Sequence, residues 1–445
     1  MVKLTQNVEV AYEVESTYSD PAGSTLSHLG LLDTFDPRSV EMNITPVPSI
    51  GQSTDSHHAS GPIAVTVPIK VACQGTGWTQ LLGRAIGSTN VDDSTGGGLD
   101  LNVPHKLTTS ADSIALLARE GTDYTLVTGV VPNEVTLTAD YTTGGYITCE
   151  ANCTGFYSQD AVGTADFSDD GKLLIDDYSS VAFPSAPTTD PLLPTDLTVG
   201  YALATEDVFR VTGPAGSYVE VGERYMKTYL KTNVLDTNVT LVGTKSPSVG
   251  VFDLADSGVD TIGELDGELE GKSGWSVTST SDDSLSVNLL KGIYQTGTQR
   301  YLSGVNSNST ALTAFTNLKT VALKIANNNT PIPGKLTRGD GSPDVTAWLA
   351  NKAISRGKAD ITLDLTMTAE DETLYDKYVA GTTIPLIRLD FGTSGSIALT
   401  NGTITAFSRP LTPGGEIVDT LSIKFRGAGD IRNFSSFAIS ADWTL

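Results

Sequence analysis

The strict alternation of residues 359–368 (ADITLDLTMT) is the feature that most constrains the fold. The apolar positions are Ala359, Ile361, Leu363, Leu365 and Met367, and the polar positions between them are Asp360, Thr362, Asp364 and Thr366. A period of two residues is typical of a β-strand that buries one face and leaves the other polar. This part of the chain therefore needs a sheet with a core on one side.

The residues after this strand predict a compact local unit over residues 356–427. Thr368 and Asp371 have the spacing of a helix capping box, and Gly381 is placed to end a short helix. Within that helix an apolar stripe is formed by Leu374, Tyr375, Tyr378 and Val379. Three further strands are predicted at residues 386–391, 397–407 and 416–425, the last two joined by a turn at 412–415.

A similar succession occurs in the first half of the chain. Residues 63–73 (IAVTVPIKVAC) alternate, a helix is predicted from Trp78 to Ile86, and strands follow at 114–118, 124–128, 135–141 and 146–154. The segment 126–129 (LVTG) parallels 399–402 (LTNG), and the turn 142–145 (TTGG) parallels 412–415 (TPGG). We therefore predict an internal duplication, the alternative being that chains rich in β-strands repeat alternation by default.

The segment between the two copies has a different character. Residues 183–197 are rich in proline, and the short strands predicted after them are separated by acidic turns. We predict a mainly β protein with two β-sandwich or barrel units, each with one short helix, and a small inserted β domain. The expected ranges are 1–156 for the first unit, 157–310 for the insertion with its linker, and 311–445 for the second unit.

The charge of the chain limits its partners. With 28 Lys and Arg against 52 Asp and Glu, the formal net charge is −24, and no basic patch occurs that would bind phosphate tightly. Three interpretations stay open: solubility, a halophilic host in which high salt screens the repulsion, and a surface that must not hold nucleic acid. No apolar run approaches the roughly 20 residues of a membrane helix, and no signal peptide is recognisable at the start. No membrane partner is therefore expected.

Few residues suggest a chemical site. Asp166, Ser168, Asp170 and Asp177 follow the ligand spacing of an EF-hand calcium loop, but no flanking helices are predicted and an Asp-rich chain produces such matches by chance. The four histidines lie in polar segments without a nucleophile motif. The three cysteines, Cys73, Cys149 and Cys153, lack zinc spacing; a bridge from Cys73 to either of the others is geometrically possible, but buried free thiols are expected. No catalytic residue and no cofactor is expected.

On these patterns the chain resembles the major tail tube proteins of long-tailed, siphovirus-like viruses of bacteria and archaea. The resemblance rests on residues 320–329 (TVALKIANNN), the alternating strand, the acidic helix, 384–391 (IPLIRLDF) and the final hairpin. The first half, from its opening VEVAYEVESTYSDPAG to residue 155, is also similar. The segment 157–310 lies outside the resemblance.

The resemblance implies a structural virion protein and not an enzyme. In that family, subunits form rings that stack into a tube, and viral DNA passes through the tube without sticking to it. With two units per chain we expect a trimeric ring with pseudo-sixfold symmetry, or a hexamer if one half alone lines the channel. The other expected partners are further tail proteins. The expected location is the virion tail, after synthesis in the host cytoplasm.

The polar face of residues 359–368 is the candidate channel lining, namely Asp360, Thr362, Asp364 and Thr366. The insertion is expected to decorate the outside of the tube. Two other classes of function stay open: a tail-tip or receptor-binding β protein, and a secreted carbohydrate-active enzyme.

Overall fold

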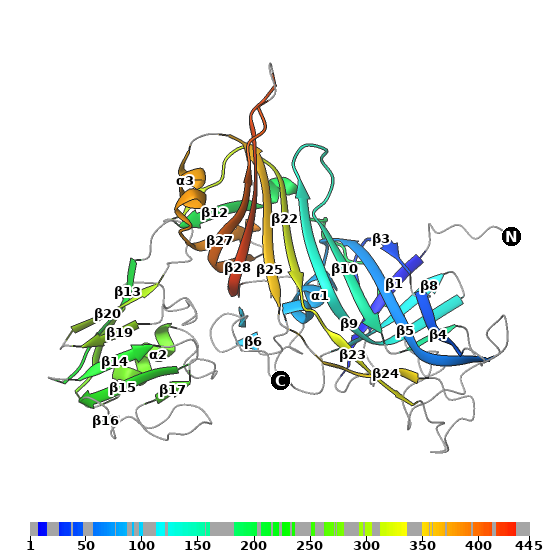
Figure 1. The fold of residues 1–445 in the computed structure, drawn as a ribbon, viewed down its shortest axis with the longest axis horizontal. Helices are drawn as coiled ribbons and strands as arrows, with labels where there is room; N and C mark the ends of the chain where they lie inside the picture. Colours follow the sequence, from blue (N-terminus) through cyan, green and yellow to red (C-terminus); the bar gives the residue numbers. More distant parts are fainter. Residues whose placement is uncertain are drawn as a thin grey trace. The chain divides into compact units, whose positions relative to one another are not determined.

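Antiparallel strands make up most of this computed structural model (Figure 1), which confirms the mainly β prediction. The residues that it describes are 8–15, 26–36, 39–47, 57–75, 77–86, 91–92, 98–100, 113–120, 123–155, 157–160, 182–202, 206–214, 217–221, 225–231, 234–235, 251–253, 262–270, 272, 274–279, 293–296, 299–304, 312–335, 349–355, 357, 359–369, 372–392, 395–411 and 415–432. The chain divides into two compact units. Unit 1 is Met1–Thr89, His105–Pro194 and Ala322–Asp360, and unit 2 is Asn90–Pro104, Thr195–Val321 and Ile361–Leu445. The three expected ranges stay a prediction.

Unit 1 is built on an antiparallel series of strands in the order β2–β1–β8–β9–β10–β5. Their bounds are Ser27–His28, Val8–Val14, Ile114–Glu120, Asp123–Asp140, Thr148–Gly155 and His57–Ala72. β9 is a single long strand where two short ones were expected. Its two halves pair with different neighbours, β8 at one end and β10 at the other.

The change of neighbour along β9 has a local cause. Gly129 adopts φ +64°, and its N–H donates to the carboxylate of Glu15 at 3.0 Å. Glu15, which directly follows β1, is 5 % exposed and also accepts a hydrogen bond from the Ser113 hydroxyl. A glycine tolerates this left-handed bend, and the buried carboxylate satisfies the amide there.

Unit 2 repeats the same order of antiparallel neighbours, as β21–β12–β26–β27–β28–β25. The bounds are Thr313–Ala314, Thr198–Ala202, Ile384–Asp390, Ser396–Ser408, Val418–Arg432 and Asp360–Thr368. Asn401 in β27 adopts φ +56°, one residue before Gly402, the counterpart of Gly129 in β9. Both units thus share one topology, which is what an internal duplication produces.

A helix follows the equivalent strand in each unit. α1 (Gly77–Ile86) comes after β5 and packs against β9, and α3 (Thr373–Ala380) comes after β25 and packs against β27. Gly381 adopts φ +62° and ends α3, as predicted, whereas the expected capping box at Thr368 is wrong. The residue before α3 is Glu372, without a side-chain cap, and Thr368 ends β25 with its hydroxyl donating to Glu416.

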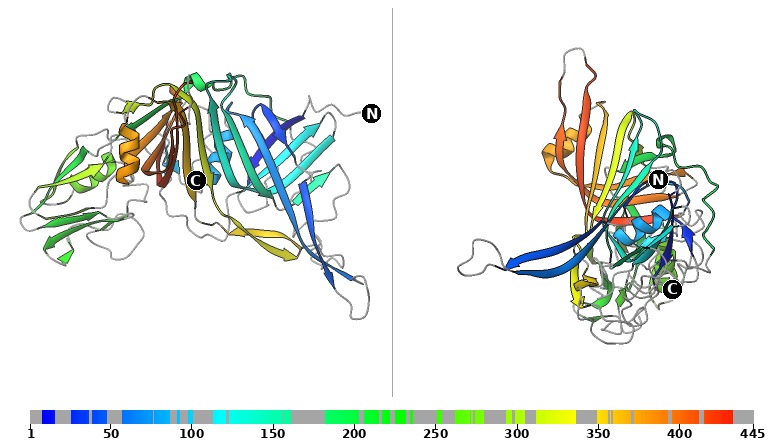
Figure 2. Two further views of the ribbon diagram at one scale, coloured as in Figure 1. Left: turned by 45° about the horizontal axis from the view of Figure 1, so that its top comes forward. Right: turned by 90° about the vertical axis from the view of Figure 1, so that its right-hand side faces the viewer.

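Other strands extend unit 1. β3 (Leu32–Phe35) and β4 (Ser39–Val47) pair with β5, and Figure 2 shows the β4–β5 hairpin, in blue, as a long arm. β23 (Thr330–Lys335) and β24 (Leu349–Ser355) pair with each other, and β24 meets β5 in parallel. β22 (Leu318–Ala326) belongs to this unit from Ala322 on and pairs with β9. β11 (Tyr157–Asp160) also pairs with β9. The first unit therefore contains residues from distant parts of the sequence.

Unit 2 contains two further sheets between β12 and β21. One has the order β18–β13–β20 (Ser276–Ser279, Glu206–Thr212, Gln299–Gly304). The other has the order β16–β15–β14–β19, with β17 also on β15 (Val234–Leu235, Tyr225–Lys231, Tyr218–Val221, Ile293–Thr296, Val251–Asp253). The helix α2 (Ile262–Glu270) buries Ile262, Leu265 and Leu269. β6 (Val91–Asp92) and β7 (Gly98–Asp100) pair with each other, and β7 pairs with β28.

The core of each unit lies on one face of its sheet. Across three strands of unit 1, Leu137, Cys149 and Val71 form one buried row. In unit 2 the row of Leu363, Ile423 and Ile404 does the same. Cys73, Cys149 and Cys153 are all free and buried, as expected from the sequence.

Candidate functional site

The opposite face of the unit 2 sheet is polar and lies on β25, β28 and β27. Its cross-strand rows are Thr362–Lys424–Thr403, Asp364–Ser422–Ala406 and Thr366–Thr420–Ser408. Residues opposite each other in a sheet share a face, so these rows form one continuous surface. Asp364, Thr420 and Lys424 are exposed, whereas Thr362 and Thr366 are half-buried.

Three of the four predicted lining residues, Thr362, Asp364 and Thr366, lie together on this face. Thr362, Asp364 and Thr366 alternate with the buried Leu363, Leu365 and Met367, and Asp360 is the first residue of the same strand. The alternation read from the sequence is confirmed from Ile361 to Met367, whereas Ala359 precedes β25 and is half-buried. Whether this face lines a channel stays a prediction.

Unit 1 has an equivalent polar face on β9, β10 and β5. Its rows include Thr136–Glu150–Lys70 and Thr138–Thr148–Ala72. Two lysines carry carboxylate partners: Lys70 on this face pairs with Asp33 at 3.0 Å, and Lys324 of β22 pairs with Glu134 of β9 at 2.8 Å. Such exposed pairs add little stability, but they reduce the positive charge that either lysine offers to a phosphate.

We did not anticipate this second surface, although the sequence carried its signal. The period of two in residues 63–73 and 146–154 places Lys70 and Glu150 opposite the apolar side of their strands. The register that puts them side by side depends on the β5–β10 pairing, which joins residues distant in sequence.

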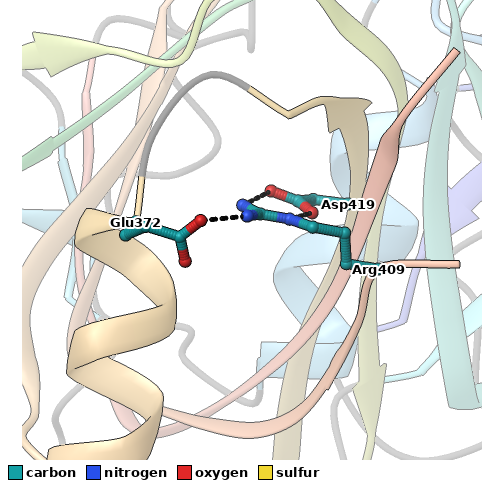
Figure 3. Close-up of polar contacts among 3 residues, drawn as sticks. All are labelled: Glu372, Arg409 and Asp419. Carbon is teal, nitrogen blue, oxygen red and sulfur yellow. Dashed lines mark hydrogen bonds and ion pairs between the residues drawn. The ribbon is translucent and has the colours of Figure 1, made fainter. Parts of the chain in front are cut away.

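A partly buried ion-pair network holds α3 to the β27–β28 hairpin (Figure 3). Arg409 donates from Nε to Asp419 Oδ1 at 2.6 Å and from Nη2 to Asp419 Oδ2 at 2.8 Å. Its remaining nitrogen, Nη1, donates to Glu372 at the start of α3 at 2.5 Å. The bond to Asp419 is the main reason that the pKa of Arg409 is raised, with the bond to Glu372 adding to it.

This network fixes geometry and offers no reactive group. A two-pronged contact between an arginine and a carboxylate is specific in direction, so it sets where α3 begins relative to the hairpin. The Asp419 side chain is 5 % exposed, and both of its oxygens are used. Sequence patterns did not reveal the network, because none of its three residues interrupts an apolar period.

A second polar contact ties the same end of the sheet. Lys319 pairs with Glu416, whose other oxygen accepts the Thr368 hydroxyl. The Thr368 N–H donates to the Asn317 carbonyl at 3.1 Å. The hydrogen bond from Lys319, followed by the one from Thr368, lowers the pKa of Glu416.

The weak calcium candidate, Asp166, Ser168, Asp170 and Asp177, lies outside the described residues. Among the residues that the structure does describe, no group of three or more His, Cys, Asp or Glu side chains is placed to hold a metal ion. Within the same residues, no helix has the length and apolar character to cross a membrane.

Comparisons with known proteins gave only a slight structural likeness. No model of a protein family matches the chain, and no curated protein matches it. Among solved structures, the chain is similar to one described as "Tail of empty GTA particle computed with helical refinement, C6 symmetry". The sequence identity is 17 %, the match covers 27 % of this chain and 85 % of that chain, and the TM-score is 0.20. A likeness of this size carries no argument, so the function has to be argued from the residues themselves.

Proposed function

We propose that the chain is the structural subunit of a viral tail tube, in which copies form stacked rings around a channel for DNA. The observation that carries the proposal is the repeated one-sided sheet. Each unit has the same strand order, an apolar face under a helix, and a polar face of Thr, Ser and carboxylate side chains across three strands.

A repeated one-sided sheet suits the wall of a channel. When the edge strand of each sheet pairs with the edge strand of the next unit, the sheets close into a barrel. Closure leaves no unpaired edge strand through which the chains could aggregate. The helix side then faces away from the channel and the polar side faces into it. In this arrangement Asp360, Thr362, Asp364 and Thr366 line the channel, together with the rows of β28 and β27 beside them.

The charge of the chain suits passage of DNA without binding. Tight binding needs several lysines or arginines that replace the counterions of phosphates. The net charge of −24 opposes this, and Lys70 and Lys324 already pair with carboxylates. DNA is repelled weakly from every side and is free to slide.

Two units per chain lead to a trimeric ring with pseudo-sixfold symmetry. The alternative is a hexameric ring in which one unit alone lines the channel. In either case the partners are other copies of the chain and further tail proteins, and the place is the virion tail. The sheets between β12 and β21 decorate the outside of the tube.

Negative-stain electron microscopy of the purified protein tests the proposal. We expect hollow tubes or uniform rings, and the mass of a ring distinguishes three chains from six. Dispersed single chains at every salt and protein concentration would contradict the proposal.

A further inference from the structure

The helix α3 leaves an unusual patch of side chains exposed. Tyr375, Tyr378 and Val379, called the α3 patch below, are 42 %, 38 % and 65 % exposed. Their spacing places them on one side of the helix. Only Leu374 of the expected apolar stripe is buried, so the amphipathic pattern is not satisfied within unit 2.

The α3 patch is held in place and not loose. The rings of Tyr375 and Tyr378 lie 5.3 and 6.1 Å from the ring of Phe407 on β27, measured between centroids. Arg409 links the start of the helix to the hairpin, and its guanidinium lies 5.6 Å from the centroid of the same Phe407 ring. A surface that is already ordered loses little conformational entropy on binding, which favours a protein partner.

The equivalent helix of unit 1 shows no such surface among its residues of known burial, Gly77 to Ala85. α1 follows β5 as α3 follows β25, and it packs against β9 as α3 packs against β27. Yet every residue of α1 from Gly77 to Ala85 is buried. Even its polar side chains are, with Thr79 at 2 %, Gln80 at 5 % and Arg84 at 6 % exposure.

We infer that the α3 patch is the docking surface for a second copy of this chain, which presents its unit 1. A chain with two equivalent units assembles head to tail when unit 2 of one copy meets unit 1 of the next. The helix face that is buried within one chain at α1 is then buried at α3 by the second copy. Exposed tyrosines suit such an interface, since each combines a large apolar ring with a hydroxyl that can stay hydrated.

This inference rests on the self-assembly in the proposed function, and it names one of the surfaces that assembly uses. The first test compares two variants of the whole chain by sedimentation. Tyr378→Ser with Val379→Ser is expected to raise the concentration needed for assembly about tenfold or more, because buried aromatic side chains dominate most interfaces. Leu411→Ser is the matched control, since Leu411 is a 74 % exposed apolar residue of unit 2 that lies outside α3.

The outcomes separate the inference from the proposed function. If the unaltered protein never assembles, the proposed function fails. If it assembles and the double variant assembles equally well, only the inference fails. A thermal unfolding curve for each variant shows whether a loss of assembly is caused by misfolding. If the double variant unfolds at a lower temperature than the unaltered protein, the test is made by the thiol-protection measurement instead.

That measurement is protection of a single introduced thiol. Val379→Cys is the probe, because Cys73, Cys149 and Cys153 are fully buried and their burial raises the pKa of each thiol. We expect a maleimide to label Cys at this position quickly in the single chain and at least about tenfold more slowly in the assembly. Slow labelling already in the single chain would overturn the inference, because the α3 patch would then be covered without a second copy. Equal fast labelling in both states would overturn it as well.

Discussion

At the residue scale, Asp140 shows how a side chain shapes the turn after β9. Its carboxylate accepts the Thr142 hydroxyl at 2.6 Å, the Thr142 N–H at 2.8 Å and the Thr143 hydroxyl at 2.9 Å. The hydrogen bonds from Thr142 are the main reason that the pKa of Asp140 falls from 3.8 to about 2. Aspartate favours such turns because its oxygens reach the backbone a few residues on.

The lowered pKa of Asp140 predicts a measurable titration. A carboxylate whose pKa is lower in the folded state stabilises it at pH above the ordinary value, and this contribution disappears as pH falls through about 2. NMR of the Asp140 carboxyl carbon should give a midpoint near 2. In Thr142→Ala the midpoint should move toward 3.8, and in Thr403→Ala, which changes a residue of unit 2, it should stay. An unchanged midpoint in Thr142→Ala would show that the hydroxyl is not the cause.

At the scale of elements, the Arg409 network decides how firmly α3 is held. Arg409→Met removes both bonds to Asp419 and leaves a carboxylate that is 5 % exposed without these donors. Because an uncompensated buried charge is costly, we expect the free energy of unfolding to fall by about 2–3 kcal/mol. Glu372→Gln is the control. Because the Glu372 side chain is 62 % exposed, removing its ion pair with Arg409 should lower the free energy of unfolding by less than about 1 kcal/mol. Denaturant unfolding of both variants gives the comparison, and equal losses would contradict this account.

The insertion between β12 and β21 offers a second prediction at this scale. Tyr201 and Thr313 are direct partners in the antiparallel pairing, so the chain leaves and returns at neighbouring points. A short glycine-containing turn in place of residues 203–311 should therefore join β12 to β21 as a hairpin. If these sheets only decorate the tube, the shortened protein should still form tubes of smaller outer diameter in micrographs. Complete loss of assembly by a shortened chain that still folds would refute the decorative role.

Local periodicity was sufficient for the elements and their faces. The alternation of β25, the end of α3 at Gly381 and the burial of three cysteines all depend on residues close in sequence. Features set by distant residues were missed. Thr368 does not cap α3 because Glu416 and Asn317 engage it, and the anchor at Arg409 joins side chains from a helix and a hairpin. For the candidate lining, the sequence identified the polar side of β25. It did not show that β28 and β27 lie beside β25 and extend this polar face.

At the scale of the whole molecule, the proposed channel lining can be tested by adding lysines to it, because tight DNA binding requires positive charges that contact phosphates. In Thr362→Lys with Asp364→Lys, two lysines join Lys424 on the polar face of β25 and β28. Because these side chains point away from the core, the fold and the assembly should survive. The expected result is that assembled tubes bind short DNA and that added salt weakens the binding steeply.

The decisive property is where that DNA lies. A matched variant, Glu264→Lys with Glu270→Lys, adds lysines to α2 in the inserted sheets, which are proposed to lie outside the tube. Both variants should bind DNA, but only the first should shield it from a nuclease too large to enter the channel. If the DNA on both variants were digested equally fast, β25 would not line the channel. Protection by the first variant alone would tie the alternating strand, through its polar face, to the passage of DNA.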